Sequence, residues 1–89
     1  MKTTKEVMSG YLERLQHLQR LALGAENASF SIEPHTADYG FCIWVNLHVW
    51  SPELDSQSYN IKDWCQKEEN DQVMREIKEY MLSLNMIEP

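Results

Sequence analysis

The segment from Phe41 to Trp50 is the longest β-strand pattern in the chain and restricts what the other segments can form. Its odd positions form an unbroken apolar row, Phe41, Ile43, Val45, Leu47 and Val49. Its even positions are mixed and comprise Cys42, Trp44, Asn46, His48 and Trp50. Because side chains alternate between the two faces of a strand, the pattern predicts one face buried by other elements and a second face that carries tryptophans.

Two helical patterns flank the strands. Thr3 and Glu6 form a capping box, and the apolar stripe after them predicts a helix over residues 4–23 that Gly24 ends. After the acidic turn at residues 67–71, a second stripe predicts a helix that Asn70 or Asp71 caps and that runs to about residue 84. Asp71 and Arg75 are spaced for an ion pair on this helix.

Two further strands are predicted, over residues 28–33 and 57–62. Pro34 is expected to end the first at a sheet edge, and residues 34–40 to form a loop. In the second, Tyr59 and Ile61 must share the face of the apolar row, so paired residue numbers sum to an even value such as 106 or 108. A sum of 107 would oppose Cys42 and Cys65 but would separate Tyr59 and Ile61 from that row. We therefore predict two free thiols.

The 89 residues suit one domain, residues 1–89. The expected fold is a two-layer α+β domain in helix-strand-strand-strand-helix order, with a three-stranded, mainly antiparallel sheet and both helices on one face. This order is similar to that of the double-stranded-RNA-binding domain. That family places lysines at the start of its second helix, where this chain has Lys67-Glu68-Glu69-Asn70-Asp71, so no residue roles follow from the similarity.

The charge distribution bears on the partners. The net charge is −6, and residues 21–61 contain no Lys or Arg. Gripping phosphates requires several cations on one face, so we expect neither direct nucleic-acid binding nor adhesion to an anionic membrane. The lack of a ~20-residue apolar run and of a signal-peptide pattern favours the cytoplasm. The acidic surface could instead mimic nucleic acid and bind a basic protein; its residues are Glu53, Asp55, Glu68, Glu69 and Asp71.

The second sheet face is the main candidate for function. Its expected members are Trp44, Asn46, His48, Trp50 and Trp64. Exposed aromatic patches of this kind mark association sites, so we predict a non-enzymatic interaction module that forms a homodimer through this face. Two alternatives stay open: a helix or the last residues cover the face, or it is a platform for a planar small ligand.

Catalysis, metals and cofactors are not expected. Cys42 and His48 point to the same side but lie six residues apart, roughly 20 Å along a strand. His35 and Asp38 share a loop, yet two ligands without a third make no metal site. The sequence therefore predicts no catalytic group, no metal and no cofactor.

Overall fold

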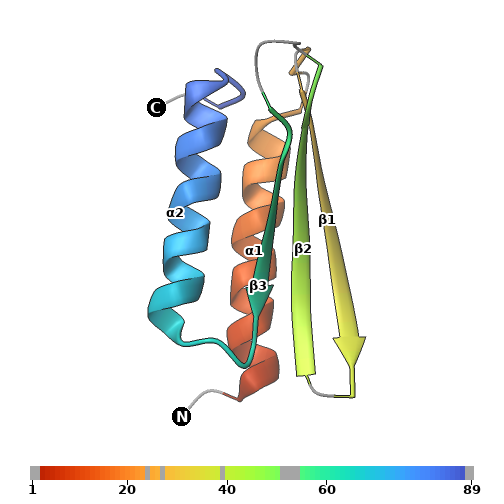
Figure 1. Cartoon of the computed structure of the whole chain (residues 1–89), viewed down its shortest axis with the longest axis vertical. Coiled ribbons are helices and arrows are strands. Elements are labelled where there is room, and N and C mark those ends of the chain that lie inside the picture. Colours follow the sequence, from red (N-terminus) through yellow and green to blue (C-terminus); the bar gives the residue numbers. More distant parts are fainter. Residues whose placement is uncertain (1–2, 24, 27, 39, 51–54, 88–89) are drawn as a thin grey trace.

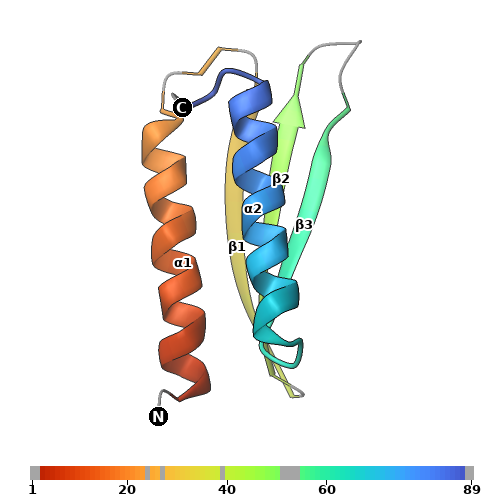
Figure 2. The ribbon, with the colours of Figure 1, turned by 90° about the vertical axis from the view of Figure 1, so that its left-hand side faces the viewer.

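The computed structural model describes residues 3–23, 25–26, 28–38, 40–50 and 55–87. The elements are α1 (Thr4–Leu21), β1 (Ala28–Ala37), β2 (Gly40–Val49), β3 (Gln57–Lys62) and α2 (Lys67–Ser83). The strands form one antiparallel sheet in the order β1-β2-β3. Both helices lie on one side of this sheet and run in the same direction (Figures 1 and 2). The expected two-layer α+β fold is confirmed.

Helix α1 begins as the capping box predicts. The Thr3 hydroxyl accepts a hydrogen bond from the Glu6 backbone N–H at 3.2 Å. The helix ends at Leu21 with Ala22 as its C-cap, two residues before the expected end. Gly24, expected to end the helix, lies outside the described residues.

Strand β1 continues through Pro34 to Ala37, so the prediction that Pro34 ends the strand is wrong. The reason follows from the ladder. Phe41 accepts from the Asp63 backbone N–H, so the odd residues of β2 direct their backbone groups toward β3. Pro34 lies opposite Ile43 and therefore has its nitrogen on the outer edge, where a missing N–H costs no ladder bond.

The pairing of β2 with β3 has the predicted parity but a different value. Ile43 pairs with Ile61 and Val45 with Tyr59, which gives a sum of 104 rather than 106 or 108. In this register Asp63 reaches Phe41, accepting from its backbone N–H at 2.7 Å. This extra anchor beyond the strand end, which sequence periodicity does not reveal, favours the shifted pairing.

Helix α2 begins at Lys67, and its N-cap Gln66, four or five residues before the expected cap, makes no side-chain capping hydrogen bond. The prediction that Asn70 or Asp71 caps it is therefore wrong. Asn70 is buried instead, and its side-chain amide bonds both the N–H and the C=O of Lys62. This contact ties the first turn of α2 to the edge of β3.

The C-terminal end of α2 is a Schellman motif. Asn85 adopts a left-handed conformation with φ of 58°, and its N–H donates to the Leu82 carbonyl. The Met86 N–H donates to the Met81 carbonyl at 3.0 Å. This turn directs Met86 and Ile87 into the core.

The core lies between the sheet and the helices. Each helix contributes an i, i+3, i+4 stripe, and the sheet contributes the apolar row of β2 together with Ile61. The residues that define it are Met8, Tyr11, Leu15 and Leu18 from α1, Ile43, Val45, Leu47 and Val49 from β2, and Met74, Ile77 and Met81 from α2. Phe41, expected in this row, is exposed at its end. Because both helices and the described C-terminal residues serve this one core, neither covers the other face of the sheet.

Candidate functional site

The uncovered side of the sheet, called the open face below, is built from alternate residues of all three strands. The cross-strand register places these residues together: Ser29, Ser31, Glu33 and His35 from β1; Trp44, Asn46 and His48 from β2; and Ser58, Asn60 and Lys62 from β3. Cys42 belongs to the same row by position but is buried between His35 and Lys62 in the register. The open face is therefore polar at its margins, and its central strand carries Trp44, Asn46 and His48.

The three tryptophans are exposed but not clustered. Trp44 is 42% exposed, Trp50 57% and Trp64 49%. Trp50 follows Trp44 by six residues, roughly 20 Å along the strand. Trp64 lies in the turn beyond β3, at the opposite end of the sheet, because the 104 register moves it away from the β2 row. Two tryptophans so far apart cannot clamp one planar ligand, whereas a long protein surface can contact both.

Polar groups occupy the space around Trp44. The Ser58 hydroxyl donates to the Asn46 side-chain oxygen at 2.8 Å across the strands. The side-chain oxygen of Asn60, whose residue is paired with Trp44, is shielded from solvent and has no hydrogen-bond partner within the described residues. A shielded oxygen without a partner is uncommon in folded proteins, and it makes Asn60 a polar position beside Trp44 that the fold leaves unsatisfied.

His48 packs against Trp50 in an edge-to-face arrangement, with ring centroids 5.7 Å apart. Its Nδ1 atom lies 3.5 Å from the Ser56 hydroxyl oxygen, which accepts from the Val49 backbone N–H at 3.0 Å. Beyond the end of the β2–β3 pairing, the Ser56 hydroxyl thus accepts the hydrogen bond that a β3 backbone carbonyl would otherwise accept. Among the described residues no carboxylate orients His48, so this contact closes the β2–β3 connection and lacks the third group of a catalytic triad.

The charges of the open face balance. The Glu33 carboxylate lies 3.6 Å from Nε2 of the His35 ring, and Lys62 lies on the other edge. Counting one glutamate against one lysine, the described part of the open face is neutral when the histidines are neutral. Two copies of a chain of net charge −6 that meet through this face therefore add little local charge repulsion.

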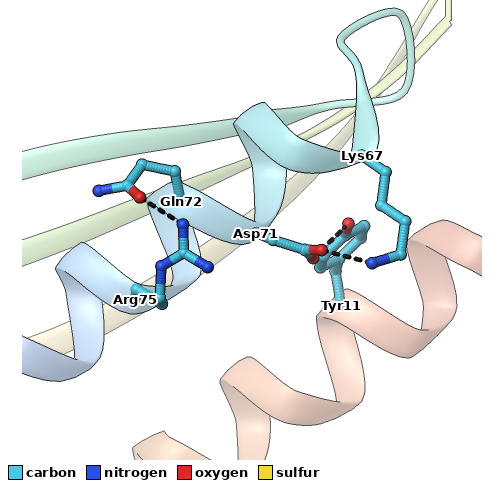
Figure 3. Close-up of polar contacts among 5 residues, drawn as sticks. All are labelled: Tyr11, Lys67, Asp71, Gln72 and Arg75. Atoms are coloured by element: carbon cyan, nitrogen blue, oxygen red, sulfur yellow. Dashed lines mark hydrogen bonds and ion pairs between the residues drawn. The ribbon is translucent and has the colours of Figure 1, made fainter.

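The acidic surface predicted from the sequence is only partly available. Glu68, Glu69 and Asp55 are exposed, whereas Glu53 lies outside the described residues. Asp71 accepts from the Lys67 ammonium and from the Tyr11 hydroxyl (Figure 3). The hydrogen bond from Lys67, and to a smaller extent the one from Tyr11, lowers the pKa of Asp71.

The expected Asp71–Arg75 ion pair is therefore wrong, because Lys67 and Tyr11 take the carboxylate and Arg75 donates to the Gln72 side-chain oxygen (Figure 3). Sequence reasoning missed the tertiary bond between Tyr11 and Asp71. The signal available was a hydroxyl-bearing residue inside the apolar stripe of α1, since a buried tyrosine hydroxyl requires a partner.

Both cysteines are free, Cys42 buried and Cys65 half-buried, which confirms the predicted thiols. Burial, followed by the neighbouring Glu69 carboxylate, raises the pKa of Cys65. No group of three or more His, Cys, Asp or Glu residues within the described ranges could hold a metal ion. None of the described helices is long and apolar enough to span a membrane.

Comparison with protein-family models, with curated proteins and with solved structures gives no significant match. The function has therefore to be inferred from the surfaces of the molecule.

Proposed function

We propose that this protein is a non-enzymatic interaction module that pairs with a second copy of itself through the open face. The observation that carries the proposal is the exposed Trp44 at the centre of a charge-balanced sheet face, on a chain of net charge −6. Exposed tryptophan is a common anchor of protein interfaces, and helix packing leaves this face without a cover.

The area of the open face determines how tight a dimer can be expected. At ~3.3 Å per residue, the ten residues of β1 and of β2 give a length of roughly 33 Å and the six residues of β3 roughly 20 Å, with strands ~4.8 Å apart. The flat area is about 400 Å², and side-chain relief brings it toward the lower limit of about 600 Å² per partner for a specific interface. A weak, micromolar dimer is therefore expected.

A symmetric dimer also brings opposite charges of the two copies together. A two-fold axis parallel to β2, between two stacked open faces, places β1 of one copy over β3 of the other and Trp44 over the partner's Trp44. Glu33 and Asn60 both pair with Trp44 in the register, and Lys62 is two residues from Asn60. In this arrangement Glu33 comes within side-chain reach of the partner's Lys62, and the reciprocal pair forms by symmetry.

The first test is sedimentation equilibrium between about 5 and 500 µM protein. We expect concentration-dependent dimerisation that Trp44→Ala weakens at least tenfold, since burial of a central tryptophan is commonly worth more than 2 kcal/mol. Val7→Ala is the matched control, because Val7 is an exposed apolar residue on α1. A monomer throughout the range, or equal effects of the two substitutions, contradicts self-association.

A charge exchange tests the geometry. Glu33→Lys and Lys62→Glu should each weaken the dimer by opposing like charges, and the double variant should restore most of the affinity. Circular dichroism of each monomer checks that the fold is retained. Additive losses in the double variant would contradict the two-fold axis along β2 without contradicting the use of the open face.

The cytoplasm remains the expected compartment. Two thiols without a disulfide, Cys42 and Cys65, suit a reducing environment. Localisation of a tagged full-length chain in its own cells measures this directly.

A further inference from the structure

A groove of about 580 Å³ lies between α1 and α2, away from the open face. Leu18 and Met74, both at least nine-tenths buried, contribute its apolar floor. Its rim carries Arg14 from α1 and Lys67, Arg75 and Lys78 from α2. The side facing away from the sheet is thus amphipathic, with a narrow apolar base and cationic walls.

The groove collects positive charge on an acidic chain. Four of the eight lysines and arginines line it, against two of the fourteen acids, Glu13 and Asp71. Because Asp71 is already engaged by Lys67, these two groups neutralise each other (Figure 3). The groove is left with three cations against one carboxylate, while the whole molecule carries −6.

The three remaining cations are Arg14, Arg75 and Lys78. Among the residues that the structure describes, Arg14, Arg75 and Lys78 form no ion pair. The Arg14 guanidinium lies over the Tyr11 ring at 4.6 Å from its centroid, and Arg75 is held by the Gln72 side-chain oxygen. Both guanidinium groups are thus oriented by neutral side chains rather than by a direct contact with a carboxylate.

We propose that this groove binds an acidic amphipathic helix of a partner protein. The cationic positions of α2 run from Lys67 to Lys78, eleven residues or about 16 Å, which matches three turns of a helix. Such a segment places an apolar stripe on Leu18 and Met74 and its carboxylates against Arg14, Arg75 and Lys78, as helix-in-groove recognition requires.

Nucleic acid fits the groove less well. A polyanion has no apolar stripe for the floor, and the exposed Glu68 and Glu69 adjoin Lys67 at the start of α2. The net charge of −6 also opposes its approach. A short acidic helix supplies both the negative charge and the apolar contact.

The probes are three 16-residue amphipathic peptides with one leucine stripe, whose polar positions are all Glu, all Gln or all Lys. Each is titrated into the ¹⁵N-labelled full chain at about 50 mM salt and at one fixed protein concentration, and followed by NMR. We expect the Glu peptide to bind at least tenfold more tightly than the Gln peptide, with shifts concentrated on α1 residues 13–18 and α2 residues 67–78. Equal affinities of the Glu and Gln peptides, no binding of the Glu peptide, or shifts on the open face would overturn the proposal.

Matched charge variants complete the test. Arg75→Gln with Lys78→Gln should weaken the Glu peptide at least fivefold, whereas Lys5→Gln with Arg20→Gln removes the same charge outside the groove and should change the affinity less than twofold. Equal losses of peptide affinity in the two double variants would show that the effect comes from net charge and not from the groove. A 16-base-pair RNA duplex that binds the groove more tightly than the Glu peptide would also refute it. Self-association through the open face is measured separately by sedimentation, so failure of the groove proposal leaves the proposed self-association unaffected.

Discussion

The clamp between Asn70 and Lys62 makes the sharpest prediction about stability. Asn70 is 5% exposed; its side-chain oxygen accepts from the Lys62 N–H at 3.2 Å, and its amide donates to the Lys62 C=O at 2.8 Å. Because Asp63 bonds Phe41 across the ladder, the neighbouring residue Lys62 directs both backbone groups away from β2. Asn70 therefore acts as the missing neighbouring strand at this point.

Two substitutions separate the parts of this clamp. Asn70→Ala removes two hydrogen bonds of about 1 kcal/mol each and leaves two half-buried backbone groups without partners, so the expected loss is about 2–4 kcal/mol. Domains of this size have total stabilities of about 5–15 kcal/mol, so the loss is measurable and large. Asn70→Asp keeps the acceptor but sets a carboxylate against the Lys62 carbonyl, and at neutral pH it should cost at least as much.

The Asn70→Asp variant also predicts the direction in which stability changes with pH. A carboxyl held in a buried site beside a carbonyl takes up a proton more readily than the same carboxyl in the unfolded chain, whose pKa is about 3.9. Folding then binds a proton, so the stability of Asn70→Asp relative to the native chain should rise as the pH falls from 7 to 5. Once protonated, the carboxyl donates to the Lys62 carbonyl as the amide did.

The assay is urea unfolding followed by circular dichroism at 222 nm, at pH 7 and pH 5. Glu79→Ala is the control, because Glu79 is an exposed residue of α2 and should change stability by less than about 0.5 kcal/mol. An Asn70→Ala chain as stable as this control, or an Asn70→Asp deficit that does not shrink at pH 5, would refute the reasoning.

Two further substitutions test the positions where sheet and helices are joined. Gly40→Ala should cost about 2 kcal/mol or more in urea unfolding, because φ is 143° and the added Cβ would lie 2.3 Å from an Asp63 carboxylate oxygen; an unchanged midpoint would contradict both reasons. Tyr11→Phe should cost about 1–2 kcal/mol at pH 7 by removing its 2.9 Å bond to Asp71. The bonds from Lys67 and then Tyr11 hold the pKa of Asp71 below its usual 3.8, so the stability they contribute is present above that value and is lost as the pH falls through the lowered pKa. The difference between Tyr11→Phe and the native chain should therefore shrink progressively as the pH falls below 3.8, and a difference that stays constant down to acid unfolding would show that the bond to the charged carboxylate is not its source.

Local patterns predicted the elements well because each depends on neighbouring residues. The Thr3–Glu6 capping box lies within one turn, and the alternation of β2 is a property of consecutive residues. The even parity of the β2–β3 pairing also followed, since Tyr59 and Ile61 had to share the buried face. The same patterns predicted which residues stand on the open face of β2.

Errors arose wherever one residue type suits two environments. Asparagine is a common helix-cap residue, but the side-chain amide of Asn70 bonds the backbone of Lys62 instead. This edge of β3 is in place only once β3 has joined the sheet. Pro34 reads as a strand end unless its nitrogen is known to face outward. Asp71 has Lys67 four residues before it and Arg75 four residues after it. In the structure it pairs with Lys67, and it also accepts a hydrogen bond from Tyr11, sixty residues away in the sequence.

The sequence by itself determined the order of the elements, the free thiols and which face of β2 is apolar, because these depend on period, composition and parity. Only the tertiary structure decided the 104 register, the wide spacing of the tryptophans and the groove between α1 and α2. Its cations, such as Arg14 and Arg75, are scattered through an acidic chain, and the parallel docking of two helices on one sheet face brings them together (Figure 2). Periodicity assigns a residue to a face, whereas the distance between two faces depends on how the elements pack.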